Sequence, residues 1–189
     1  MKPNGIHYIC HKEVLMTKRT LNEHLTQLDQ NSQATQEQID HLATRFKGIF
    51  NKLGYKKSAK DMDTLREYVD MIFECQDYRC THWLQVAEGE LNGVWNRPSK
   101  GYMGWRTTQV WYEIDHVHPR NAGGTDSLTN FQFLSANANQ FVKCSLTYED
   151  LLKRVDLSDA LKDRIRNVLE RRKKLFQSER WTNFVNNLS

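Results

Sequence analysis

Two short strand patterns in an otherwise helical sequence constrain the fold of this chain most strongly. Residues 108–114 (TQVWYEI) are β-branched and aromatic, and residues 130–134 (NFQFL) alternate Phe131 and Phe133 around Gln132. Both patterns are typical of strands. Between them, Pro119 and the pair Gly123-Gly124 favour a bend and a wide loop. The sequence therefore predicts an α+β protein that is mostly helical, with one small hairpin at its centre.

Helical patterns flank this hairpin on both sides. The clearest covers residues 35–53, where Thr35 and Gln38 form a capping-box pattern and apolar residues recur at spacings of three and four. Gly54 is placed to end that helix. We expect further helices over residues 12–28, over 61–75, from Ser135 to about Lys143, from Thr147, and from about Ser158.

Composition excludes several classes of protein. Of 189 residues, 39% are hydrophobic and 26% are charged, which is an ordinary balance for one folded core. No run approaches the ~18 apolar residues of a membrane span, and the N-terminus lacks the pattern of a secretory signal. Four cysteines are too few for a disulfide scaffold of this size. We expect no membrane association and a cytoplasmic location.

The net charge of +4 is mild, but the basic residues are concentrated. Residues 44–60 carry Lys56 and Lys57 among six basic residues with no acid, and residues 171–174 begin with Arg171 and Arg172. Each run is either a solvated helix face or a nucleic-acid contact, and the sequence leaves both interpretations open.

The candidate catalytic and metal-binding residues all lie within the segment 113–143. Asp115 and His116 end the first strand pattern, Asn130 opens the second, and Asn139 lies on the helix that follows. Adjacent strand residues point to opposite sides, so Asp115 and His116 share a target only where the chain bends. A helix folded back over the hairpin would bring Asp115 and Asn139 together as oxygen ligands for a hard divalent cation. His116 would then be a general base.

The order of these residues resembles the HNH family of ββα-metal endonucleases. The matching segments are EIDHVHP (113–119), GGTDSLTNFQFL (123–134) and NANQFVK (137–143). The upstream segment ECQDYRC (74–80) resembles the segment that precedes the hairpin in many phage-encoded members. The resemblance implies a ββα-metal core made of this hairpin and the helix after it.

The resemblance also implies roles. His116 takes a proton from water, Asp115 and Asn139 bind one divalent cation (Mg²⁺ or Mn²⁺), and Asn130 holds the loop so that His116 faces the phosphate. Lys143 resembles the family's trailing lysine, a phosphate contact, although it follows Asn139 by four residues where three is commoner. Many relatives carry a structural zinc on two Cys-x-x-Cys pairs. Here Cys75 and Cys80 have another spacing, and Ser135 and Ala138 occupy the second pair, so no structural zinc is expected.

From this resemblance we expect a metal-dependent DNA endonuclease that leaves 5′-phosphate and 3′-hydroxyl ends on double-stranded DNA. A homing-type enzyme fits best, in the host cytoplasm if phage-encoded; the alternatives are a restriction-type HNH enzyme and a non-catalytic DNA-binding module. Three regions are expected: residues 1–60, helical and DNA-contacting; 61–146, the nuclease core; and 147–189, a basic helical extension. Arg106 and Arg120 near the motif form either a phosphate track or a solvated loop. The sequence does not indicate an oligomeric state.

Overall fold

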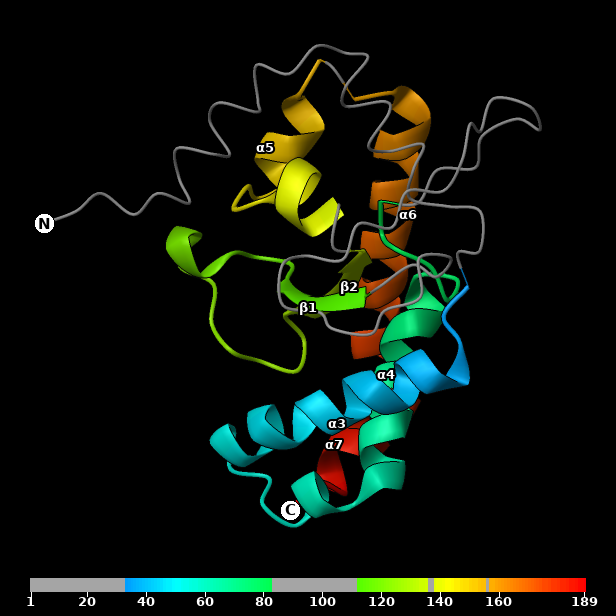
Figure 1. Cartoon of the computed structure of the whole chain (residues 1–189), viewed down its shortest axis with the longest axis vertical. Coiled ribbons are helices and arrows are strands. Elements are labelled where there is room, and N and C mark those ends of the chain that lie inside the picture. Colours follow the sequence, from blue (N-terminus) through cyan, green and yellow to red (C-terminus); the bar gives the residue numbers. More distant parts are fainter. Residues whose placement is uncertain (1–32, 83–111, 136–137, 156) are drawn as a thin grey trace, which may run out of the picture.

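The computed structural model describes residues 33–82, 112–135, 138–155 and 157–189, which form helices around a two-stranded sheet (Figure 1). The α-helices are α3 (Gln36–Lys52), α4 (Met62–Cys75), α5 (Tyr148–Lys153), α6 (Asp159–Phe176) and α7 (Glu179–Asn186). The strands are β1 (Tyr112–His116) and β2 (Phe131–Ser135), and the shorter helical turns are η1 (Ser58–Lys60), η2 (Arg120–Ala122) and η3 (Ala138–Lys143). A mostly helical α+β chain with one central hairpin was predicted, and this is confirmed.

Side-chain caps fix where the helices begin. At the start of α3 the Thr35 hydroxyl accepts from the Gln38 N–H, and the Gln38 side chain accepts from the Thr35 N–H. The hydroxyls of Thr147 and Ser158 cap α5 and α6 by accepting from the N–H groups of Asp150 and Leu161. These three predicted helix starts are confirmed. Gly54 follows α3 with φ +96°, a conformation that glycine adopts without the steric cost of a Cβ.

The strands β1 and β2 pair antiparallel, with Tyr112 opposite Ser135 and His116 opposite Phe131. Side chains alternate along each strand, so Glu113 and Asp115 share one face, while His116 lies on the other. All of β2 is buried, whereas most of β1 is only partly covered. The partly exposed polar residues of the sheet therefore lie on β1.

An aromatic core joins the hairpin to the helices. Phe46 of α3 makes edge-on contacts with Tyr68 of α4 and with Phe131 and Phe133 of β2, at centroid distances of 4.8, 5.5 and 6.1 Å. Such edge-to-face pairs add to the free energy of simple burial. In Figure 1, α3 crosses on one side of the hairpin and α5 lies on the other, with α6 running alongside. The core thus fixes the hairpin against α3.

One buried cluster includes residues from each of the three predicted regions, for example Phe46, Phe133 and Ile165. Residues 147–189 were predicted to be helical, but α7 was not predicted as a separate helix; it adds Trp181 and Phe184 to this cluster. The expected helix over 12–28 and the first part of the expected strand, 108–111, lie outside the described residues.

Among the residues that the structure describes, no helix has both the length and the apolar composition needed to cross a membrane.

Candidate active site

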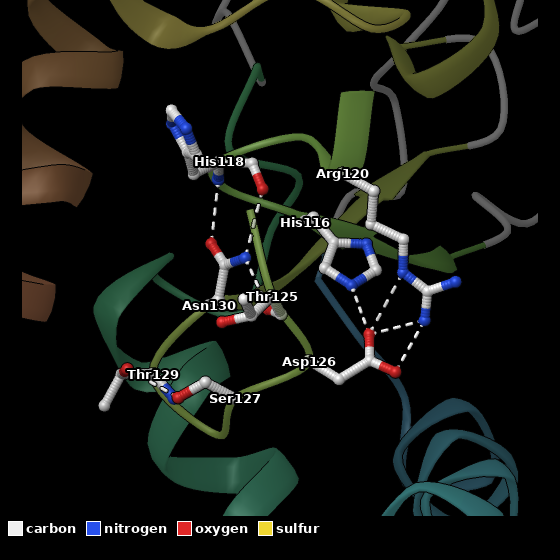
Figure 2. A network of polar contacts seen from close by, with 8 residues as sticks. All are labelled: His116, His118, Arg120, Thr125, Asp126, Ser127, Thr129 and Asn130. Atoms are coloured by element: carbon white, nitrogen blue, oxygen red, sulfur yellow. Dashed lines mark hydrogen bonds and ion pairs between the residues drawn. The ribbon is translucent and has the colours of Figure 1, made fainter. Parts of the chain in front are cut away.

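The loop between β1 and β2 is closed by the side chain of Asn130. Its Oδ1 accepts from the His118 N–H at 2.8 Å, and its Nδ2 donates to the carbonyl oxygens of His118 (3.0 Å) and Thr125 (2.9 Å) (Figure 2). The Asn130 carbonyl also accepts from the Val117 N–H at 2.8 Å. One residue at the start of β2 therefore holds both ends of the loop together, which places the end of β1 in a fixed position.

Two adjacent glycines let the loop turn this tightly, each for its own reason. Gly123 has φ +93°, which favours glycine over other residues. Gly124 has an ordinary φ, but a Cβ built on it would lie 1.8 Å from the His118 carbonyl oxygen. The side chain of His118 braces the same turn, with Nε2 2.8 Å from the Ala122 carbonyl oxygen. The loop geometry thus depends on both glycines.

His116 is the last residue of β1, and its imidazole faces Asp126 across the loop. The Nε2 atom lies 2.8 Å from Asp126 Oδ1, and the ring packs against Phe131 with centroids 5.0 Å apart. The side chain keeps 19% of its surface exposed. The ring is therefore held by two neighbours yet reachable from solvent.

Arg120 holds Asp126 from the other side. Its Nη2 donates to both carboxylate oxygens at 2.5 Å, as Figure 2 shows, although the arginine side chain itself is 64% exposed. Hydrogen bonds from Arg120 and then His116 lower the pKa of Asp126 to about 2. Asp126 was not predicted as a site residue; the available signal was a carboxylate between the glycine pair and Asn130.

Asp115 lies on the opposite face of β1 from His116, in a half-buried polar cluster. Its Oδ2 accepts from Gln132 Nε2 at 2.9 Å and lies 3.8 Å from Lys143 Nζ. Burial raises the pKa of Asp115, and the positive charge of Lys143 and the hydrogen bond from Gln132 oppose that rise. The structure thus pairs this predicted metal ligand with an ammonium group.

Asn139 comes to the same face of β1 as Asp115. Its Nδ2 donates to Glu113 Oε2 at 2.7 Å, and Glu113 and Asp115 are two positions apart on the strand. The turn η3 that carries Asn139 is a π-type turn, because the Cys144 N–H donates to the Asn139 carbonyl five residues back. The Ala138 N–H donates to Ser135 Oγ at its start. The structure therefore brings Asp115 and Asn139 to one side of the hairpin and His116 to the other.

Lys143 lies inside the molecule instead of at a phosphate-binding surface. Its side chain is fully buried, with Nζ 3.4 Å from the His116 carbonyl oxygen and 5.2 Å from the centre of the Tyr148 ring. Burial lowers the pKa of Lys143, and the charge of Asp115 opposes the effect. The π-type turn accommodates the extra residue between Asn139 and Lys143. In this conformation the expected contact between Lys143 and phosphate is wrong, because the ammonium has no surface open to a ligand.

A chain of buried hydrogen bonds leads to Asp115, and the sequence did not indicate it. Tyr148 donates its hydroxyl proton to Gln132 Oε1 at 2.7 Å, and Gln132 donates onward to Asp115. Since the Tyr148 proton is used in this way, His82 Nε2, 3.2 Å from the Tyr148 oxygen, is the donor to it. Every donor in this chain points towards the carboxylate, which fixes the orientation of Asp115.

The segment 74–80 is tied to the hairpin through a side-chain amide. Gln76 accepts from the Phe133 N–H at 3.0 Å and donates to the Phe133 carbonyl at 2.7 Å, so it pairs with β2 as a neighbouring strand would. Cys80 is also buried here, and its Sγ accepts from the Ser135 N–H at 3.2 Å. The segment 74–80 therefore supports β2 through hydrogen bonds to its backbone.

The predicted DNA-contacting residues have different positions. Lys56 and Lys57 are exposed after the end of α3. Arg171 is half-exposed and paired with Asp77. Arg172 is buried and donates to the Thr129 carbonyl at 3.0 Å, so its expected contact with DNA is wrong. Arg106 lies outside the described residues.

The Asp115 face carries oxygen groups of the kind that hard divalent cations bind. Such ions prefer carboxylate and amide oxygens and keep several waters, and Asp115, Asn139 and Glu113 carry such groups. Within the described ranges no three His, Cys, Asp or Glu side chains gather in a way that could hold a metal by themselves. A cation here would thus need Asn139, water or a substrate phosphate as further ligands, and it would compete with Lys143 for Asp115.

Comparisons with known proteins add no relative: no family model, curated protein or solved structure matches this chain.

Proposed function

We propose that the chain is a divalent-metal-dependent DNA endonuclease of the HNH type, with His116 as general base. The observation that carries the proposal is the loop closed by Asn130. That closure fixes His116 at the end of β1, while Asp115 and Asn139 lie on the opposite face of the same strand end. Metal-assisted phosphodiester hydrolysis requires a fixed base and oxygen ligands for a cation, and this strand end carries both.

In the proposed reaction a phosphodiester binds at the end of β1, within reach of His116 on one face and of Asp115 and Asn139 on the other. His116 removes a proton from a water molecule as the water oxygen bonds to phosphorus. The bond from phosphorus to the 3′ oxygen breaks, and the leaving oxygen takes a proton from solvent. A cation held by Asp115 and Asn139 would supply Lewis-acid stabilisation of the negative charge on the phosphate. The products carry 5′-phosphate and 3′-hydroxyl ends.

The surface charge supports a nucleic-acid substrate. Lys56 and Lys57 are exposed beyond the end of α3, and α3 packs against the hairpin through Phe46. Exposed lysines contact phosphates without reading bases, so they would supply affinity more than sequence specificity. A homing-type role remains part of the proposal.

The test is cleavage of supercoiled plasmid DNA with Mg²⁺ or Mn²⁺, with EDTA as the metal-free control. We expect His116→Gln to slow cleavage by about 10²–10⁴-fold, because a positioned general base contributes that much. Asp115→Asn should raise the metal concentration that cleavage requires, because an amide binds a hard cation more weakly than a carboxylate, while the circular dichroism spectrum stays native. The neighbouring variant His118→Gln should lose at most a few-fold, since the His118 ring only braces Ala122.

Two outcomes would overturn the proposal. One is His116→Gln cleaving as fast as the unmodified protein. The other is purified protein that binds DNA but leaves plasmid, single-stranded DNA and RNA intact with either metal. That second result would instead support the non-catalytic DNA-binding module.

A further inference from the structure

We propose that Asp126 is the positioning residue for His116: its carboxylate fixes the imidazole tautomer, so that Nδ1 carries the lone pair that accepts the proton from water. This inference rests on the proposed nuclease function and adds to it a residue outside the motif positions identified from the sequence.

The tautomer follows from what each group can donate. An ionised carboxylate only accepts hydrogen bonds, so the 2.8 Å contact requires a proton on His116 Nε2. A neutral imidazole has a single N–H, which leaves Nδ1 unprotonated. When Nδ1 takes up a proton, the ring becomes an imidazolium, and the negative charge of Asp126 stabilises it. This is the role that the buried aspartate has in a Ser-His-Asp triad.

Asp126 is itself held in place, which a positioning residue requires. Arg120 donates to both of its oxygens, with Nη2 at 2.5 Å from each and Nε at 3.2 Å from Oδ1. The Thr125 carbonyl, one residue before it, is fixed by Asn130. The loop, the arginine and the strand end thus leave Asp126 one orientation, and Phe131 limits rotation of the imidazole ring it contacts.

The contacts of Asp126 Oδ1 decide which substitution tests this role. Oδ1 accepts from both His116 and Arg120, so in Asp126→Asn the amide oxygen can take this position and keep its contact with the ring. Asp126→Leu removes every acceptor at this position. Nε2 then has no partner that fixes its proton, and the imidazole should exchange between its two tautomers.

The experiment has an activity arm and a spectroscopic arm. For Asp126→Leu we expect kcat for plasmid cleavage to fall about 100-fold with KM nearly unchanged, because the orientation of the base is lost while DNA contacts remain. For the conservative variant Asp126→Asn we expect kcat to stay within about tenfold of the unmodified protein, because the amide oxygen still accepts from Nε2. The matched control is Asp163→Asn, which removes an exposed carboxylate paired with Arg166 on α6.

The spectroscopic arm needs no activity. ¹⁵N NMR of the His116 ring should show protonated Nε2 in the unmodified protein and a mixture of the two tautomers in Asp126→Leu. A mixed tautomer in the unmodified protein, or full kcat in Asp126→Leu, would overturn the positioning role while leaving the nuclease proposal intact. A protein that cleaves nothing but has the expected tautomers would overturn the nuclease proposal alone.

Discussion

Gly124 is the residue of the loop with the least freedom to change. A Cβ at this position would lie 1.8 Å from the His118 carbonyl oxygen and 2.9 Å from the Pro119 carbonyl oxygen. Both obstacles are backbone atoms of the same loop, so neither can swing aside as the end of a flexible side chain would. Any side chain here must push the two halves of the loop apart.

We therefore expect Gly124→Ala to destabilise the protein by about 1–3 kcal/mol, the usual range for forcing atoms into a packed site. The measurement is the free energy of unfolding from a denaturant titration. The matched control is Gly48→Ala in α3, where a Cβ meets nothing within 4 Å and helix propensity should stabilise by up to about 1 kcal/mol. Equal effects of the two substitutions would contradict the steric account.

At the scale of single residues, the sequence indicated the parts of the site that local chemistry decides. The glycine pair was identified because a bend in a loop favours such residues, and the loop-holding role of Asn130 was implied by the resemblance to the HNH family. Asp126 and the burial of Lys143 were not identified, because both depend on which segments pack together. A basic residue four positions after Asn139 has the same sequence pattern whether its ammonium meets a phosphate or a buried carboxylate.

At the scale of elements, β1 and the loop after it form one rigid unit. Its two faces carry different functional groups. His116 belongs to the face shared with Phe131, and Asp115 belongs to the face shared with Gln132. The alternation along a strand fixes this division. His116 is the last paired residue of β1, so both faces meet at the same end of the strand. The loop that begins there therefore fixes the positions of His116 and Asp115 relative to each other.

Removing the Asn130 side chain should loosen this unit without unfolding it. In Asn130→Ala the amide of His118 loses its acceptor, so its hydrogen exchange should accelerate, by about tenfold for each 1.4 kcal/mol of lost protection. The Val117 amide is the internal control, because it donates to the backbone carbonyl of residue 130, which the substitution keeps. Equal acceleration at Val117 and His118 would mean that the whole strand end frays. The Asn130 side chain would then not be what closes the loop.

The helices and strands were predicted where caps and apolar spacing act locally, as at Thr35, Thr147 and Ser158. The strand β1 ends at His116, as the sequence predicted, whereas β2 lies one residue further along than expected and ends at Ser135. The short helix α7 lacked a long apolar repeat; it is held by burial of Trp181 and Phe184 against Tyr68, a contact more than a hundred residues away in the chain. Long-range packing of this kind leaves no local pattern.

At the scale of the whole molecule, the buried polar chain makes stability depend on pH. His82 is fully buried and donates to Tyr148. Burial, and then the positive charge of Lys143, lower the pKa of His82 to about 3 from an ordinary value of 6.5. Its Nδ1 finds no hydrogen-bond partner within the described part of the chain. The folded protein therefore holds this ring neutral over most of the acidic range.

The direction of the pH effect follows from proton uptake. Above pH 6.5 the imidazole is neutral in both states and contributes no pH dependence. Below pH 6.5 His82 binds a proton in the unfolded chain. In the folded protein it stays neutral until the pH falls to about 3. Over that window His82 should lower the free energy of unfolding by up to about 1.4 kcal/mol per pH unit.

The variant His82→Gln removes the titrating group while keeping an N–H that can reach Tyr148. Its free energy of unfolding should fall less steeply between pH 6.5 and 4 than that of the unmodified protein, with the two curves closest in slope above pH 7. NMR titration supplies the direct measurement, because the His82 ring signals should stay those of a neutral imidazole down to pH 4. A His82 that titrates near 6.5 would show that solvent reaches the ring, which would contradict the buried hydrogen-bond chain from His82 to Asp115.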